Sequence, residues 1–205
     1  SDAREVAARL SIPVLDLVPG EAAGDFTLKG GQPGTAAKPG PATPEDEALV
    51  LHTSGTTARP KIVPLTQANI CASARNIART LSLGPDDACL NIMPLFHIHG
   101  LMAAVLASVG AGGAVVCTQG FDALRFFRWL DEERPSWFTA VPTMHQAILG
   151  RAERNAEIIA RAKLRFLRSS SASLPGPVMR QLELAFSAPL VESYGMTEAA
   201  HQMCS

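Results

Sequence analysis

Short apolar runs alternate along the chain with segments in which apolar residues recur every three or four positions. The short runs predict buried strands, and the longer spacing predicts helices that pack one face against a sheet. The predicted strands cover residues 13–18, 48–52, 88–93, 114–117, 137–141, 164–167 and 190–192. The predicted helices cover residues 3–10, 67–81, 101–109, 122–133 and 175–186, and a further helix begins at Pro142. This alternation indicates an α/β fold with a mostly parallel sheet layered with helices.

The first part of the chain differs in composition from the rest. Residues 19–44 are dominated by Gly, Pro, Ala and Thr, which predicts a surface loop and not a packed element. We therefore expect residues 1–47 to form a peripheral segment and residues 48–205 to form the α/β core. Ligands of such a core bind at the carboxyl ends of its strands. The loops expected to meet at that edge follow His52, Met93, Leu167 and Glu192.

Composition and charge narrow the classes of partner. The chain has 205 residues, of which 47% are hydrophobic, and this suits a globular protein with a large core. Its formal net charge of −1 provides no basic field for nucleic acid. The four cysteines are widely spaced and form no CxxC pair. We therefore predict reduced, mostly buried thiols in a cytoplasmic protein.

Residues 98–118 contain no charged side chain and would be long enough to span a membrane. Gly110, Gly112 and Gly113 interrupt this stretch, however, and divide it into a helical part and a short strand. The pattern therefore predicts a buried helix–turn–strand unit with no membrane insertion.

The segment Thr53–Lys61 (TSGTTARPK) concentrates hydroxyls, a glycine and two cations. Small residues let backbone N–H groups approach an anion, hydroxyls donate hydrogen bonds, and a lysine supplies a compact positive charge. A Ser/Thr-rich surface turn accounts for the same composition equally well. The segment is not a Walker A loop, because Pro60 stands where that motif needs glycine and Ile62 where it needs Ser or Thr.

Two further motifs follow in order, MPLFHIHG from Met93 and YGMTE from Tyr194. Together the three resemble the TSGTTGxPKG, PxFH and YGxTE signatures of the adenylate-forming (AMP-binding, acyl-CoA synthetase) superfamily. Ala58 and Ile62 depart from the pattern, since the superfamily usually has glycine there. The resemblance covers residues 48–205 and implies part of the N-terminal domain of an ATP-dependent carboxylate-activating enzyme.

The resemblance also implies a role for each motif in forming an acyl-adenylate. The residues implied to hold the phosphates of ATP are Thr53, Ser54, Gly55, Thr56, Thr57 and Lys61. Those implied to contact adenine and the α-phosphate are Ser171, Ala172, Ser173, Tyr194, Gly195, Met196 and Thr197. Glu198 is the implied ligand of Mg²⁺, a hard ion that prefers oxygen ligands. The implied catalytic residues are Lys61, His97, Thr197 and Glu198.

Histidines mark the acyl end of the implied site. His97 and His99 alternate, but a pair at this spacing without a third ligand is poor evidence for zinc. The resemblance places His97 where it positions the substrate carboxylate. Together with His97, Ser171 and His201 suit a second carboxylate through charge-assisted hydrogen bonds, although His201 could equally pack beside the Mg²⁺ site. We expect His145 to be a core or surface histidine in a helix near the pocket wall.

A finer resemblance, carried by LRFLRSSSASL from Leu164 and MTEAAHQM from Met196, is to the oxalate–CoA ligase group. Gly195 replaces the alanine of that group's YAMTE motif. The expected function is ATP-dependent activation of a small dicarboxylate such as oxalate and its transfer to CoA. Alternatives are a fatty-acid or aryl-acid CoA ligase, an adenylation domain that loads a carrier protein, and a non-catalytic nucleotide-binding module. The superfamily's later motifs and C-terminal domain do not occur in these 205 residues, so we expect them alone to have little adenylation activity.

Overall fold

The computed structural model describes residues 2–22, 24–31, 40–53 and 60–205. The chain divides into two compact units, Ser1–Pro41 and Ala42–Ser205, and each is described by itself. No helix in the described ranges is both long and apolar enough to cross a membrane.

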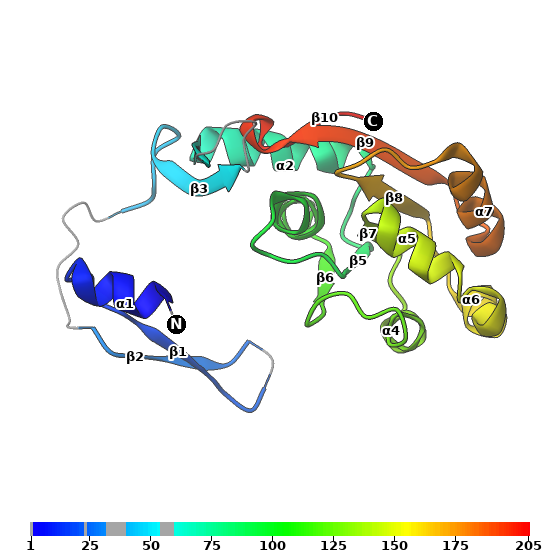
Figure 1. Cartoon of the computed structure of the whole chain (residues 1–205), viewed down its shortest axis with the longest axis horizontal. Helices are drawn as coiled ribbons and strands as arrows, with labels where there is room; N and C mark the ends of the chain where they lie inside the picture. The colour runs from blue at the N-terminus through cyan, green and yellow to red at the C-terminus, as the bar shows by residue number, and fades with distance from the viewer. Residues whose placement is uncertain (1, 23, 32–39, 54–59) are drawn as a thin grey trace. The chain divides into compact units, whose positions relative to one another are not determined.

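The first unit contains one helix and a two-stranded antiparallel ribbon (Figure 1). Helix α1 (Asp2–Arg9) confirms the helix predicted there, and strand β1 (Asp16–Pro19) overlaps the strand predicted at 13–18. Strand β2 (Phe26–Lys29) lies inside the segment predicted as a loop, so that prediction was wrong. All four β2 residues are exposed. A strand without buried residues need not show an alternation of apolar and polar positions, so the sequence pattern did not reveal it.

The second unit is built on a six-stranded sheet with the order β10-β9-β8-β7-β5-β6. Its strands are β5 (Ala88–Asn91), β6 (Ala114–Cys117), β7 (Trp137–Ala140), β8 (Phe166–Ser170), β9 (Leu190–Met196) and β10 (His201–Cys204). The strands from β9 to β6 run parallel, and only β10 is antiparallel to its neighbour. The predicted α/β class with a mostly parallel sheet is confirmed.

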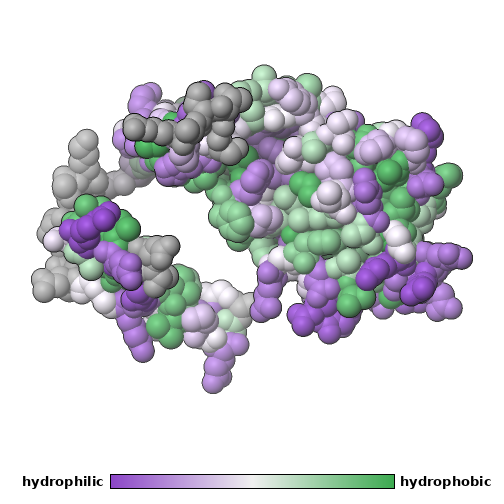
Figure 2. Space-filling model, in the orientation of Figure 1, coloured by the Kyte–Doolittle hydropathy of each residue, from purple (hydrophilic) through white to green (hydrophobic). Residues whose placement is uncertain are grey.

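Helices cover both faces of this sheet (Figure 1). One face carries α2 (Gln67–Thr80), η1 (His99–Leu106) and α3 (Ala107–Gly110); the other carries α4 (Phe126–Glu133), α5 (Pro142–Leu149), α6 (Ala156–Arg161) and α7 (Gly176–Phe186). Successive side chains of a strand point to opposite faces of the sheet. Trp137 packs with α2 and η1, and its neighbour Phe138 packs with α4, α5 and α7. Hydrophilic residues gather on the surface over α4 and α6 (Figure 2).

Strands β3 (Glu47–Thr53) and β4 (Lys61–Thr66) form a separate antiparallel hairpin, in which Thr53 pairs with Lys61. The loop that follows Thr53 lies outside the described residues, so its expected place at the edge of the parallel sheet stays a prediction. The predicted phosphate-binding residues Ser54, Gly55, Thr56 and Thr57 lie outside the described residues. Thr66 then caps α2, because its Oγ accepts from the Asn69 N–H (3.3 Å) while the Asn69 side chain accepts from the Thr66 N–H (3.0 Å).

Several elements are longer than predicted or were missed. Strand β8 runs to Ser170 and β9 to Met196, so residues expected in loops lie in strands. Their polar side chains hid these extensions from a reading based on apolar runs. The short turns η2 (Glu153–Asn155) and η3 (Thr197–Ala199), together with α6 and β10, were not predicted. Of the four free cysteines only Cys89 is buried, so the prediction of mostly buried thiols was wrong.

The uncharged stretch 98–118 forms the predicted helix–turn–strand unit, with η1 and α3 followed by β6. Helix η1 is a π-helix, a wide form often found at functional sites. Its second residue, Gly100, lies so close to the preceding loop that a Cβ there would come within 2.6 Å of the Pro94 carbonyl oxygen. Glycine therefore allows the chain to turn tightly into η1 just after the predicted histidine motif.

A polar cluster joins three strands at their amino ends, at the edge opposite the predicted site. The carboxylate of Asp87 accepts two hydrogen bonds from the Arg165 guanidinium, both of 2.8 Å, and one from the Ser136 hydroxyl of 2.7 Å. These residues precede β5, β8 and β7 respectively. Burial alone would raise the pKa of Asp87, but the hydrogen bonds from Arg165 and Ser136 outweigh it and lower that pKa.

Candidate active site

The three sequence motifs meet in one small apolar cluster. Val63 and Leu65 come from β4, directly after Lys61, while Ile98 and Met102 flank the start of η1. Ala200 follows Glu198 and completes the cluster. Lys61 itself is the first residue of β4 and is exposed, so it lies in a strand and not in the predicted loop. Residues next to the three motifs are therefore held together by packing of the hairpin on η1 and on the turn after β9.

A pocket of about 530 Å³ lies where β8 and β9 end. Its lining residues are Ser171, Ala172, Ser173, Glu192, Ser193, Tyr194, Gly195, Cys204 and Ser205. Residues predicted to contact adenine from two separate motifs thus share one pocket at the carboxyl ends of adjacent parallel strands. This is the edge at which ligands of such sheets bind.

Tyr194 lines this pocket and is 64% exposed. A flat aromatic surface of this kind is suited to stacking against a planar base. Gly195 pairs with Gln202 of β10, and a Cβ at Gly195 would overlap the carbonyl oxygen of His201. Glycine thus permits β10 to lie close to β9, and an alanine here would require β10 to shift.

The carboxylate predicted to hold Mg²⁺ is on η3, which begins at Thr197. Glu198 is exposed, and no group of three or more potential metal-ligating side chains occurs among the residues that the structure describes. One carboxylate fits Mg²⁺ when the other ligands are phosphate oxygens and waters, whereas it would not make a site for zinc. The residues present therefore fit a Mg²⁺ ion that arrives with a nucleotide.

The two histidines of the PLFHIH motif differ sharply in environment. His97 is exposed, and its Nδ1 accepts a hydrogen bond from the His99 backbone N–H (3.1 Å). His99 is fully buried, with Nδ1 lying 3.0 Å from the Ser171 hydroxyl and Nε2 lying 2.6 Å from the Thr139 hydroxyl. Its ring stacks on His201 with the ring centroids 5.1 Å apart. The buried network behind the pocket is thus built on His99, and not on His97.

Arg168 lies at the centre of that network. Its side chain projects from β8 and is fully buried. Nη1 lies 3.2 Å from His99 Nε2 and 3.3 Å from the Thr139 hydroxyl, and Nη2 lies 3.2 Å from His201 Nε2 and 2.9 Å from Gln202 Oε1. Within the described ranges Nε has no hydrogen-bond partner, and no carboxylate forms an ion pair with this guanidinium.

Burial controls the protonation of these groups. It lowers the pKa of His201 to about 3, with help from the Arg168 charge, and the same two causes place the pKa of His99 well below its usual value. Burial also lowers the pKa of Arg168 to about 10, which leaves the guanidinium protonated near neutral pH. The cluster therefore consists of one cation surrounded by neutral imidazoles.

Two residues at the pocket end of the network hold unusual backbone conformations. Ser171 has a φ of 75° and His201 a φ of 100°, in the region that favours glycine. Ala200 beside His201 also has a positive φ, and its carbonyl oxygen accepts a hydrogen bond of 2.6 Å from the Ser73 hydroxyl of α2. Such strain clusters at functional sites, where the surrounding structure holds it in place.

His145 belongs to α5 on the opposite face of the sheet and is fully buried, as expected for a core histidine. Its Nε2 donates a hydrogen bond of 3.0 Å to the backbone carbonyl of Arg168. Burial lowers its pKa to about 4, although this hydrogen bond opposes the shift.

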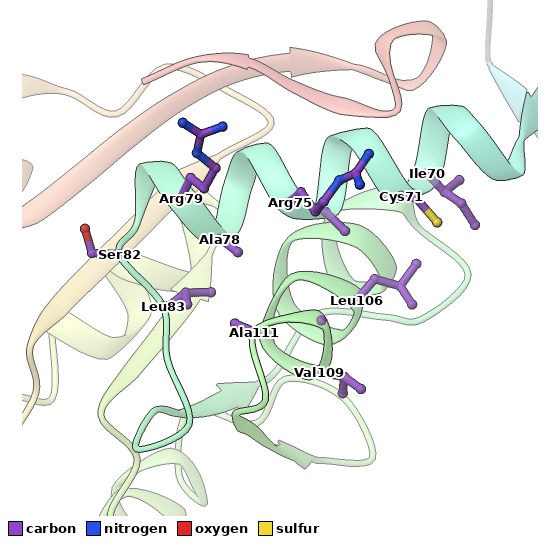
Figure 3. Close-up of a pocket in the computed structure, with 12 residues that line it drawn as sticks. Ile70, Cys71, Arg75, Ala78, Arg79, Ser82, Leu83, Leu106, Val109 and Ala111 are labelled. Carbon is purple, nitrogen blue, oxygen red and sulfur yellow. The ribbon is translucent and has the colours of Figure 1, made fainter. Parts of the chain in front are cut away.

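A second hollow, of about 680 Å³, lies between α2 and the η1–α3 segment (Figure 3). Its walls are mainly apolar, with Ile70, Leu83, Leu106 and Val109, and it holds no residue of the three motifs. It is larger than the pocket at the strand ends, and its lining also includes Cys71, Arg75, Arg79 and Ser82.

Sequence reasoning missed four members of the buried network, namely His99, Thr139, Arg168 and Gln202. A signal for one was present, because Phe166 and Arg168 share the alternation of a buried strand. An arginine at a core position of a strand is rare without a partner.

An α/β sheet with a pocket at its parallel strand ends, flanked by an aromatic ring, hydroxyls and an exposed carboxylate, defines a nucleotide-binding enzyme fold. The chain belongs to the family of AMP-binding enzymes, which it matches over residues 2–205.

Three curated relatives show which kind of AMP-binding enzyme the chain resembles. The chain is 49% identical over 164 residues to the oxalate–CoA ligase of Arabidopsis thaliana, covering 79% of the chain and 32% of the relative. It is 42% identical over 167 residues to the oxalate–CoA ligase of Saccharomyces cerevisiae, covering 82% of the chain and 30% of the relative. It is 39% identical over 198 residues to the sulfoacetate–CoA ligase of Cupriavidus necator, covering 94% of the chain and 37% of the relative. The chain thus spans about a third of the length of these relatives.

Among solved structures, a malonyl-CoA ligase in a ternary product complex with methylmalonyl-CoA and AMP superposes with a TM-score of 0.72. The sequence identity is 31%, and the match covers 80% of this chain and 36% of that one. The fold of the second unit is therefore that of adenylate-forming CoA ligases.

Proposed function

We propose that the complete gene product activates a short dicarboxylic acid, oxalate first among the candidates, with ATP and transfers the acyl group to CoA. The observation that carries the proposal is a polar network behind the pocket: Ser171 lines the pocket, its hydroxyl lies 3.0 Å from His99 Nδ1, and His201 stacks on His99. A fatty-acyl chain would need an apolar lining instead. The names of three similar proteins also support it, because oxalate, sulfoacetate and malonate each carry a second acidic group.

In the first step a carboxylate oxygen of the acid attacks the α-phosphorus of ATP. The bond from that phosphorus to the bridging oxygen breaks, and pyrophosphate leaves with the electron pair. In the second step the CoA thiol attacks the acyl carbon, loses its proton, and displaces AMP. Thr197 and Lys61 are proposed to donate to phosphate oxygens as charge develops on them. A Mg²⁺ ion held by Glu198 would neutralise phosphate charge when bound.

Tyr194 is proposed to stack on adenine, with Ser171, Ala172 and Ser173 leaving room beside it. His97 is proposed to position the reacting carboxylate. A neutral His97 would carry its proton on Nε2, because its Nδ1 already accepts from the His99 backbone N–H. It would therefore offer one hydrogen bond to an anionic substrate.

The test is ATP–pyrophosphate exchange by the complete gene product with oxalate, malonate, sulfoacetate, acetate and hexanoate in parallel. We expect exchange with oxalate and little with hexanoate. Consumption of the CoA thiol in the same reaction distinguishes a CoA ligase from an enzyme that loads a carrier protein. Exchange with hexanoate while oxalate is inert would refute the proposal, and ATP binding without exchange for any acid would identify a binding module instead.

A further inference from the structure

The guanidinium of Arg168 is a buried charge for which the described residues supply no counter-ion. Arg165, three positions earlier, differs from Arg168 in both burial and charge pairing. Arg165 is partly exposed and makes a two-bond ion pair with Asp87, whereas Arg168 is fully buried and contacts only neutral groups. Burying an unpaired charge is costly, so such a charge is retained where an anion binds or where it acts on its neighbours.

The guanidinium also sets the direction of every hydrogen bond around it. A guanidinium can only donate, so each partner must accept from it. His99 and His201 therefore both face Arg168 with an unprotonated Nε2, and each carries its proton on Nδ1. Gln202 likewise faces it with Oε1, which turns the amide NH₂ away from the cation.

The consequence reaches the pocket wall through Ser171. Because His99 carries its proton on Nδ1, that N–H donates to the Ser171 hydroxyl oxygen 3.0 Å away. The hydroxyl hydrogen of Ser171 is then available to an acceptor in the pocket that this residue lines. At Gln202, the amide NH₂ that is turned away from the cation donates to the Ser205 hydroxyl (3.3 Å), and Ser205 also lines the pocket.

We propose that Arg168 makes this end of the pocket a receptor for the second acidic group of the substrate, by orienting the donor at Ser171 through His99 and by adding a buried positive charge behind it. Arg168 is a positioning and specificity-determining residue, not a catalytic one. This inference rests on the proposed function, since it names the residue by which that function selects a short diacid.

The test compares oxalate with oxamate, which has nearly the same shape but carries a neutral amide in place of one carboxylate. In the complete gene product, Arg168→Met removes the charge and retains an unbranched apolar stem. We expect the KM for oxalate to rise by at least about 30-fold. We expect the KM for oxamate to change by less than about 3-fold, since a neutral amide gains little from the charge. Arg168→Lys restores the charge and should recover most of the preference for oxalate.

Arg165→Met is the matched control, because it removes a neighbouring arginine at the opposite end of the strand. It should lower the melting temperature and leave the oxalate-to-oxamate ratio of kcat/KM unchanged. A folded Arg168→Met variant with the wild-type ratio would overturn the inference, and so would an equal loss for both acids. If Arg168→Met does not fold, His201→Phe retains the stacked ring and removes the nitrogen that accepts from Arg168 Nη2 and holds the guanidinium in place. That variant should raise the KM for oxalate selectively, and an unchanged ratio would again overturn the inference.

The two proposals fail in different ways. If the wild-type protein activates no diacid, the proposed function fails. If it activates malonate or sulfoacetate but not oxalate, the same comparison uses that acid and its uncharged amide counterpart. If a diacid is a substrate and its preference survives loss of Arg168, only the inference about Arg168 fails.

Discussion

The His99 imidazole and the Ser171 hydroxyl lie 3.0 Å apart, although 72 positions separate them in the sequence. This hydrogen bond joins η1 to the segment after β8 and is the point where the buried network reaches the pocket. Ser171 is therefore both a wall of the pocket and the last member of a chain that begins at Arg168.

Ser171→Ala should weaken binding of the acid in the complete gene product. Loss of one hydroxyl donor predicts a rise in the KM for oxalate of about 5- to 10-fold. The buried His99 N–H also loses its acceptor, which should lower the stability by about 1–3 kcal/mol. Steady-state kinetics with saturating ATP measure the effect. Ser187→Ala is a matched control, since Ser187 is also exposed with a positive φ but follows α7. Equal effects of the two substitutions would argue against a role for Ser171.

Glu198→Gln should impair the use of Mg²⁺. Replacing the charged oxygen ligand by an amide weakens the hold on a hard cation, and we expect kcat to fall by about 100-fold. A titration of pyrophosphate exchange against Mg²⁺ should also show that a higher concentration is needed for half-maximal rate. Glu157→Gln on α6 is the control. A Mg²⁺ curve identical to that of the wild type would remove Glu198 from the metal site.

His145 should make the protein less stable in acid. Its pKa is about 4 in the folded state and near 6.5 when exposed, so the neutral form is favoured by folding. This contribution is complete above pH 6.5 and is lost as the pH falls toward 4, by up to about 3 kcal/mol.

His145→Gln should therefore reduce the loss of unfolding free energy between pH 6.5 and 4, measured by urea denaturation of the complete gene product. His52→Gln, at an exposed position of β3, should leave that loss unchanged. An unaltered pH dependence in the His145 variant would contradict the burial argument.

Asp87→Asn should destabilise the fold without changing substrate affinity. The substitution removes the charge that Arg165 faces and weakens a link between three strand starts, at a cost of about 1–3 kcal/mol because Arg165 is partly exposed. The folded pKa of Asp87 is lowered, so its stabilising effect is present above the unfolded pKa and is lost as the pH falls through the folded value. Urea midpoints at pH 7 should differ, while the KM for oxalate should not.

The sequence predicts the layered architecture well because buried strands such as β7, with all four residues buried, leave a clear apolar run. It fails where a strand carries polar side chains. Arg168 and Ser170 lie in β8, and their burial depends on partners from η1, β7, β9 and β10 that no local pattern reveals. The motifs likewise predict which residues contact ligands, whereas the residues behind them, such as His99 and Thr139, emerge only from the packing.

The hydrogen bond from His145 to the Arg168 carbonyl has a consequence beyond the pH effect. On the face covered by α5, His145 binds the backbone carbonyl of Arg168, while the Arg168 side chain reaches the pocket network on the other face of the sheet. Arg168 thus connects the two faces of the sheet at this point. Substitutions on α5 that shift His145 should therefore change the ratio of kcat/KM between acids. Residues of a helix that does not line the pocket would in this way affect substrate preference.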